Sequence, residues 1–174
     1  MLLEKDKFFE WAYSDLLINS QRGHLAEYIV AVALGLTGQK RQEWDPYDLE
    51  YGDIKIEVKS AAFVQGWEQN KHSVIGFDIK PTRFFNIDKN RYEDEYKRQS
   101  DVYVFCHLKH KERETINPTD VTQWDFYIAS TETLNERLKE QKRVSLSVLK
   151  TICSNKICFE NIKEEIDNIN ITRI

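Results

Sequence analysis

The stretch that decides the fold is Ile54-Lys-Ile-Glu-Val-Lys-Ser60. Its apolar and charged residues alternate with a period of two, which is typical of a β-strand with one buried face. The apolar residues predict a core on one side of this strand, so Glu57 and Lys59 point together to the other side. Two positions apart on a strand, these two residues lie about 6–7 Å from each other.

A carboxylate precedes this strand across a tight turn. The turn falls at residues 51–53, and the segment 43–51 before it predicts a strand that returns antiparallel. Such a hairpin sets Asp48 near Lys55, at the same end of the sheet as Glu57. Converging carboxylates repel each other unless a cation lies between them, and a hard oxygen-binding ion such as Mg²⁺ is a natural partner. A lysine beside that ion can orient or deprotonate a water, or stabilise charge on a phosphate.

A third carboxylate lies inside an apolar helix. Residues 20–34 predict this helix, with Ser20 as its N-cap and Gly35 as a stop signal. Glu27 sits among small and apolar neighbours on the helix, where a carboxylate needs a cation or a hydrogen-bond network. Glu27 is therefore a candidate functional residue.

The remaining pattern predicts a mixed α/β fold. Residues 101–108 are almost continuously apolar, which is typical of a central strand covered on both faces. The other expected elements are a helix at 4–15, a strand at 73–79, a helix at 87–98, a strand at 124–129 and helices at 131–141, 147–152 and 161–169. We expect one domain over residues 1–174, with its core at about 20–110, while residues 111–174 complete or decorate the sheet.

Composition narrows the class of protein. Hydrophobic residues make up 41% of the chain and charged residues 31%, as in a globular protein. The formal net charge of -4 is not the basic balance of many nucleic-acid-binding proteins, but a local basic stripe is enough to hold phosphates. Three cysteines are too few for a disulfide framework, and the charged N-terminus and lack of a long apolar run predict a cytoplasmic chain without a membrane segment.

The order of these pieces resembles the PD-(D/E)xK nuclease superfamily, which has the restriction-endonuclease-like fold. The pieces are Gly23-His-Leu-Ala-Glu27, Asp45-Pro-Tyr-Asp48 and Ile56-Glu-Val-Lys-Ser60. The last string is also similar to that of archaeal Holliday-junction resolvases. The resemblance covers residues 20–63 closely and the strands as far as about Leu108 by architecture. It implies a central mixed sheet flanked by helices.

The resemblance also implies a metal-dependent nuclease that hydrolyses phosphodiester bonds to a 5′-phosphate and a 3′-hydroxyl. Asp48 and Glu57 would bind Mg²⁺, for which Mn²⁺ would substitute, and the backbone carbonyl of Val58 would supply a further ligand. Lys59 would position the attacking water. Glu27 would hold the water shell of the metal or a second ion.

One departure from the family pattern leaves alternatives open. The family has a Pro-Asp dipeptide where this chain has Pro46-Tyr47-Asp48, so Asp45 and Asp53 are alternative ligands. Asp48 is favoured because Asp53 sits in the turn and Asp45 is farther from Glu57.

Several other residues are weaker candidates. Gln65 and Gln69 follow the lysine strand, where some nucleases of this superfamily have a glutamine. His24 precedes Glu27 by about one helical turn. Between residues 80 and 98 six basic residues face four acidic ones, which suits either a phosphate-tracking surface with aromatic neighbours or a solvated helix face.

DNA is the expected substrate, RNA stays open, and no membrane partner is expected. A homodimer follows from the resemblance, because cutting two strands needs two sites. The main rival hypothesis is an inactive nuclease-like fold that serves as a DNA-binding or assembly module. The complete set of Asp48, Glu57 and Lys59 argues against it. A second rival is an unrelated α/β protein in which these residues form surface ion pairs.

Overall fold

A four-stranded sheet forms the centre of the protein. The computed structural model describes residues 2–38, 40–41, 45–86, 89–153 and 155–169. The central strands are β1 (Leu49–Tyr51), β2 (Ile54–Ala62), β6 (Val102–Leu108) and β7 (Trp124–Ser130), in the spatial order β1-β2-β6-β7. β2 and β6 run parallel, whereas β1 with β2 and β6 with β7 are antiparallel. The predicted central mixed sheet is confirmed.

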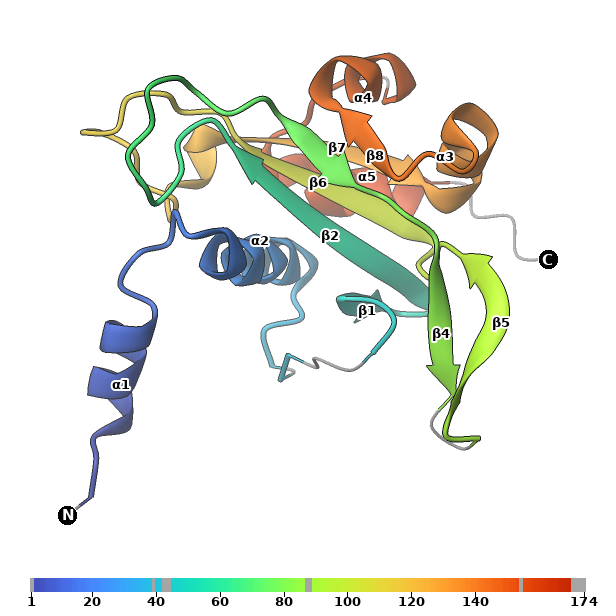
Figure 1. Ribbon diagram of the computed structural model, residues 1–174, viewed down its shortest axis with the longest axis horizontal. Coiled ribbons are helices and arrows are strands. Elements are labelled where there is room, and N and C mark those ends of the chain that lie inside the picture. Colours follow the sequence, from blue (N-terminus) through green and yellow to red (C-terminus); the bar gives the residue numbers. More distant parts are fainter. Residues whose placement is uncertain (1, 39, 42–44, 87–88, 154, 170–174) are drawn as a thin grey trace.

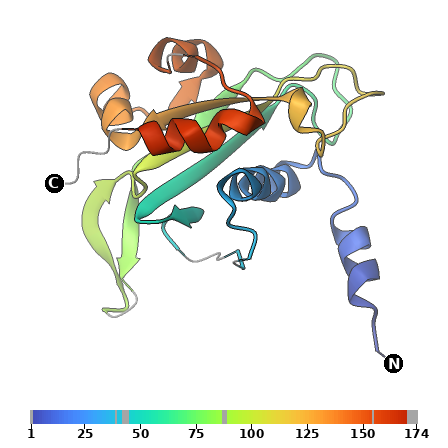
Figure 2. The same cartoon turned by 180° about the vertical axis from the view of Figure 1, so that it is seen from behind.

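Helices and a small second sheet cover the two faces of the central sheet (Figure 1). One face packs against α2 (Asn19–Leu34) and α5 (Ile162–Asn168). The other face packs against β3 (Gly76–Asp78), α3 (Thr131–Leu138), β8 (Arg143–Ser145) and α4 (Leu146–Ile152). The view from behind shows α5 lying across the sheet on the same side as α2 (Figure 2).

The predicted central strand is confirmed in β6. Val102 and Val104 belong to the core beneath α2 and α5, while Tyr103 and Phe105 belong to the core beneath α3 and α4. Every residue of β6 is buried, because a strand in the middle of a three-layer structure has no solvent-facing side. This explains why its sequence is continuously apolar.

Helix α2 lies close to its predicted position. It ends at Gly35, which takes a left-handed φ of 73° as the predicted stop signal. Its start differs from the prediction, because Ile18 is the N-cap and no side chain caps the first turn. The prediction of Ser20 as N-cap is therefore wrong, since Ser20 lies inside the helix.

The predicted helix at 87–98 is wrong. The structure has a β-hairpin there, formed by β4 (Thr82–Asn86) and β5 (Arg91–Lys97), while Ile87 and Asp88 lie outside the described residues. Tyr92 and Tyr96 are four residues apart, a spacing that places two side chains on one face of a helix and equally on one face of a strand. Pairing with β4, which the periodicity did not reveal, decides between the two.

Other boundaries shift by several residues. Of the strand predicted at 43–51 only β1 is a strand, while residues 42–44 lie outside the described part. The strand predicted at 73–79 is limited to β3, and its partner β8 was not predicted. The described part of the chain also contains two short 3-10 helices, Val121–Gln123 and Phe159–Asn161.

Helix α1 (Lys5–Ala12) stands apart from the rest of the fold (Figure 1). None of its residues is buried. None of the helices in the described part of the chain is long and apolar enough to span a membrane.

Arg98 ties the end of the hairpin to the body of the protein. It follows β5 and is 6% exposed. Its guanidinium donates to the backbone oxygens of Ile79 (3.0 Å), Lys139 (2.9 Å) and Gln141 (3.0 Å), and to the side chain of Asn135 (2.5 Å). These bonds join three chain segments through one buried side chain: the end of β5, the residue after β3, and α3 with the loop that follows it.

We predict that Arg98→Ala lowers the free energy of unfolding by about 3 kcal/mol, because it removes a buried side chain and its four hydrogen bonds and leaves the buried carbonyl of Ile79 without this donor. Urea denaturation followed by circular dichroism measures this difference. The control is Arg91→Ala, which removes an exposed arginine from the same hairpin and is expected to cost less than about 0.5 kcal/mol. Equal effects of the two substitutions would contradict the anchoring role.

Candidate active site

The hairpin between β1 and β2 sets the position of Asp48. A two-residue turn at Gly52-Asp53 pairs Tyr51 with Ile54, and Gly52 takes a positive φ of 60° that suits a glycine. Each residue of β1 is thereby assigned one partner on β2.

This register differs from the predicted one. Glu50 lies opposite Lys55, and the backbone N–H of Asp48 donates to the Ile56 oxygen at 3.0 Å. Asp48 is therefore next to Glu57 and not, as predicted, near Lys55. The prediction failed because the turn contains two residues rather than three.

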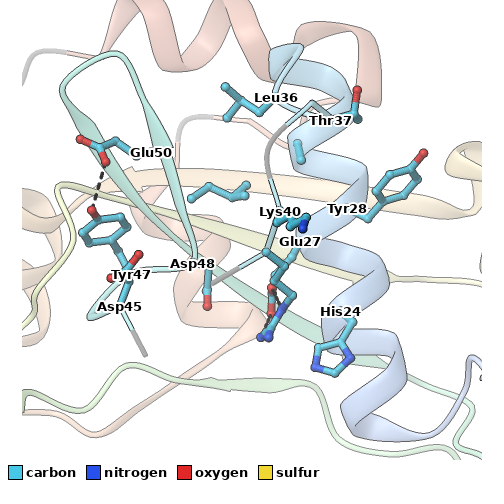
Figure 3. A pocket seen from close by; sticks show the side chains of 13 residues that line it. His24, Glu27, Tyr28, Leu36, Thr37, Lys40, Asp45, Tyr47, Asp48 and Glu50 are labelled. Atoms are coloured by element: carbon cyan, nitrogen blue, oxygen red, sulfur yellow. Dashed lines mark hydrogen bonds and ion pairs between the residues drawn. The ribbon is translucent and has the colours of Figure 1, made fainter. Parts of the chain in front are cut away.

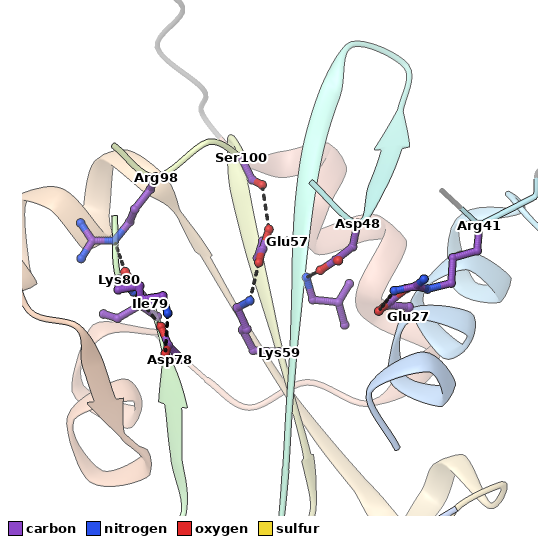
Figure 4. Close-up of polar contacts among 11 residues, drawn as sticks. Glu27, Arg41, Asp48, Glu57, Lys59, Asp78, Ile79, Lys80, Arg98 and Ser100 are labelled. Atoms are coloured by element: carbon purple, nitrogen blue, oxygen red, sulfur yellow. Dashed lines mark hydrogen bonds and ion pairs between the residues drawn. The ribbon is translucent and has the colours of Figure 1, made fainter. Parts of the chain in front are cut away.

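Glu57 and Lys59 point together to one face of β2, as predicted. Their side chains form an ion pair, and the Ser100 hydroxyl donates to the other Glu57 oxygen at 3.3 Å (Figure 4). The parallel pairing with β6 sets Tyr103 beside Glu57. Glu57 thus lies between a lysine of its own strand and polar groups at the start of β6.

The backbone of Val58 faces Asp48. The Val58 N–H donates to Asp48 Oδ2 at 2.7 Å. The Lys55 oxygen accepts from Asp101 on the β6 side, whereas the Ile56 oxygen accepts from Asp48 on the β1 side. Because peptide groups alternate along a strand, the carbonyl of Val58 is directed to the β1 side as well. The β1–β2 ladder begins at Leu49, so this carbonyl lies beyond its paired part.

Glu27 approaches the same edge from α2. Arg41 holds it with two bonds, from Nε to Oε2 at 2.5 Å and from Nη2 to Oε1 at 3.1 Å. His24, Glu27 and Asp48 line one pocket of about 560 Å³, which we call the Asp48 pocket (Figure 3). Asp45 lines it too, so this alternative ligand is close to the favoured one.

Burial and repulsion raise the pKa of Asp48 to about 7. Loss of solvent is the largest cause, and the negative charges of Glu57 and Glu27 add to it, while the bond from Val58 opposes it. Both glutamates therefore act electrostatically on Asp48. The structure brings three of the predicted carboxylates to one edge of β2.

Lys59 is partly buried in the same cluster. Burial disfavours its ammonium form, but the charge of Glu57 and the hydrogen bond to it outweigh this, so the pKa of Lys59 is raised. The lysine is therefore a cation at neutral pH.

The remaining weaker candidates lie elsewhere. Gln65 is buried beyond the end of β2, where it accepts from Arg22 at 3.1 Å and donates to the Ala62 oxygen. Gln69 accepts from the Gln65 N–H in the loop that follows. Within the described residues the structure does not bring either glutamine to Asp48.

Sequence reasoning missed several residues near the site. Arg41 gave no signal, because it lies in a segment without periodicity. Tyr103 and Ser100 become recognisable only once β6 is known to run parallel to β2. Tyr103 lines a second pocket of about 280 Å³, which we call the Lys59 pocket. Its lining includes Glu57, Lys59, Asp78, Lys80, Thr82 and Tyr103.

This mixed sheet carries neighbouring carboxylates and a cationic lysine at one edge. Phosphodiester hydrolases use side chains of these kinds to bind a metal ion and to stabilise charge on a phosphate. Comparison with protein families defines the class further: residues 10–148 match the family model described as bacteriophage T4 endonuclease IV. The match covers more than half of the chain, and the chain belongs to this family. It is thus a hydrolytic nuclease with a nucleic-acid substrate, and the family indicates DNA. Neither a curated protein nor a solved structure matched the chain in the same comparisons.

The raised pKa of Asp48 predicts a pH-dependent stability. The folded protein holds this proton more tightly than the unfolded chain does, so the group favours folding most below about pH 4. That contribution is lost as the pH rises through 7. Asp48→Asn removes the charge, and without metal it is expected to raise the free energy of unfolding at pH 8 by about 1–3 kcal/mol.

Urea denaturation in EDTA at pH 5 and pH 8 measures this effect. The advantage of Asp48→Asn should be large at pH 8 and small at pH 5. Asp94→Asn, an exposed change on β5, is the control and should alter stability little at either pH. An advantage of Asp48→Asn that is the same at both values would show that charge repulsion is not its cause.

Proposed function

We propose that the chain is a divalent-metal-dependent DNA endonuclease of the PD-(D/E)xK type. The observation that carries this proposal is that Asp48 is partly buried near the open edge of β2, where the charges of Glu57 and Glu27 add to burial in raising its pKa. Such repulsion between partly buried groups is unfavourable unless a cation relieves it. A divalent ion is the chemical partner that the arrangement suits.

The donor set fits Mg²⁺. Asp48 and Glu57 would supply carboxylate oxygens and Val58 its backbone carbonyl, all of them hard ligands. No group of three His, Cys, Asp or Glu side chains already surrounds a common point among the described residues. A Mg²⁺ site does not need such a cage, because the ion keeps several waters and uses one or two carboxylates. Mn²⁺ prefers the same ligands and is expected to substitute.

The bound ion would neutralise charge on the scissile phosphate and lower the pKa of a water. Lys59, held as a cation by Glu57, would orient the attacking water and stabilise negative charge on the phosphate. Its raised pKa favours this electrostatic role over that of a general base. Glu27 would hold the water shell of the ion or a second ion, and Arg41, now bonded to Glu27, lies at the edge where a phosphate would arrive.

The substrate is proposed to be DNA cut at internal bonds. The homodimer and the cytoplasmic location stay predictions.

Cleavage of supercoiled plasmid tests the proposal. Wild-type protein should nick the plasmid with Mg²⁺ or Mn²⁺ and be inactive in EDTA. Glu57→Gln and Lys59→Ala should each lower the rate by about 10²–10⁴-fold, because each removes a charge that acts in the transition state. Agarose gels over a time course measure these rates.

Lys55→Ala is the matched control, since it removes an exposed lysine from the same face of the same strand. It should retain activity within about threefold. Cleavage that persists in EDTA, or that survives Glu57→Gln in folded protein, would overturn the proposed site. Metal binding by calorimetry without cleavage of plasmid, junction or RNA substrates would instead support an inactive binding module.

A further inference from the structure

The β4–β5 hairpin projects from the sheet close to the start of β2 (Figure 1). In its register Arg83 lies opposite Tyr96 and Phe85 opposite Tyr92, so these four side chains share one face. Tyr92 is 55% exposed, Tyr96 66% and Phe85 40%. Large aromatic side chains that lie together on an exposed hairpin are typical of an interaction surface or a ligand-binding site.

Arg83 is held in place by these rings. Its guanidinium carbon lies 5.3 Å from the centre of the Tyr92 ring and 5.6 Å from that of Tyr96. Cation–π contacts orient the planar group and leave its N–H donors available to a ligand. No ion pair to Arg83 occurs among the described residues. A phosphate, which guanidinium binds in bidentate fashion, is the matching ligand.

A groove of about 660 Å³, the hairpin groove, runs along this face. Its lining includes Lys80, Thr82, Arg83, Tyr92, Tyr96 and Lys142. Three cations in the lining face one carboxylate, that of Glu140. Lys80 and Thr82 also line the Lys59 pocket, so the hairpin groove and that pocket are neighbours.

The hollow on the other side of the hairpin suits a polyanion less well. It is lined by Glu93, Asp94 and Glu95 together with Lys55 and Lys97, whereas the hairpin groove has three cations and one carboxylate. A polyanion is therefore attracted more strongly to the hairpin groove.

From this geometry we propose that the hairpin groove binds the DNA strand next to the scissile phosphate. This rests on the proposed function, since it gives that site its substrate-binding arm. Arg83 and Lys142 bind backbone phosphates, and Lys80 connects them to the Lys59 pocket. Tyr92 and Tyr96 orient Arg83 and pack against the nucleotides.

Fluorescence anisotropy with labelled DNA oligonucleotides, single-stranded and duplex, tests the groove in EDTA. Gel analysis confirms that the DNA stays intact. Arg83→Ala should raise Kd about tenfold, and the slope of log Kd against log salt should fall by about 0.7–0.9, as for one lost phosphate contact. Tyr92→Ala with Tyr96→Ala should weaken binding similarly but keep the slope, because no charge is removed.

The matched control is Arg91→Ala, which removes an arginine from the opposite face of the same hairpin. Arg91 neighbours Tyr92 on β5 and therefore points away from the groove. This variant should bind within about twofold of wild type. Arg83→Lys, which keeps the charge, should restore the salt slope, and this result separates a phosphate contact from a folding defect.

Two results would contradict the proposal that the hairpin groove binds DNA. One is equal DNA binding by Arg83→Ala and Arg91→Ala, and the other is competition by polyglutamate as effective as that by unlabelled DNA. In steady-state cleavage, Arg83→Ala should raise KM and leave kcat near the wild-type value. Failure of the proposed function appears separately, as absence of metal-dependent cleavage while the binding difference between the two arginine variants persists.

Discussion

The register of the β1–β2 hairpin, with Tyr51 opposite Ile54, determines how the candidate site is assembled. With this register, Asp48 lies just before Leu49, the first residue of β1 that pairs with β2. The Asp48 side chain can therefore accept a hydrogen bond from the Val58 N–H, which β1 does not reach. A shift of one residue would turn the side chains of one strand to the opposite face and separate Asp48 from Glu57. The site therefore depends on a two-residue turn several residues away from it.

The three carboxylates near this hairpin differ in whether a cation of the chain contacts them. Glu57 has Lys59 and Glu27 has Arg41, each in direct contact, whereas the Asp48 carboxylate receives a single backbone hydrogen bond among the described residues. Burial is the largest cause of the raised pKa of Asp48, and because no cation contacts this carboxylate directly among the described residues, the charges of Glu57 and Glu27 raise the pKa further. This difference also identifies Asp48 as the position where an added cation relieves most repulsion. Lys59 and Arg41 neutralise Glu57 and Glu27, and we propose that a bound metal ion neutralises Asp48.

Local patterns predicted the parts of this protein that depend on burial. The alternation in β2 and the almost continuous apolar run of β6 reflect the layers that cover them, and the glycine that ends α2 reflects the left-handed backbone at Gly35. What could not be predicted depends on pairing between distant segments. The charged segment 87–98 was predicted to be a helix, because exposed charged residues suit a helix as well as a hairpin and the pairing of β5 with β4 was not recognised. Arg41 and Tyr103 reach the site only through the tertiary fold.

We propose that catalysis and DNA binding are carried by two parts of the fold that differ in rigidity. Glu57 and Lys59 are carried by the part of β2 that pairs with β6 and packs in the core, so their geometry is held without a ligand. Arg83 is carried by a two-stranded ribbon, which by itself is a weak structure. Arg98 compensates for this by anchoring the end of the ribbon with four hydrogen bonds to the body. A binding arm that is fixed at its base and exposed along its length can adapt to a DNA strand while the distance from its base to Lys59 stays constant.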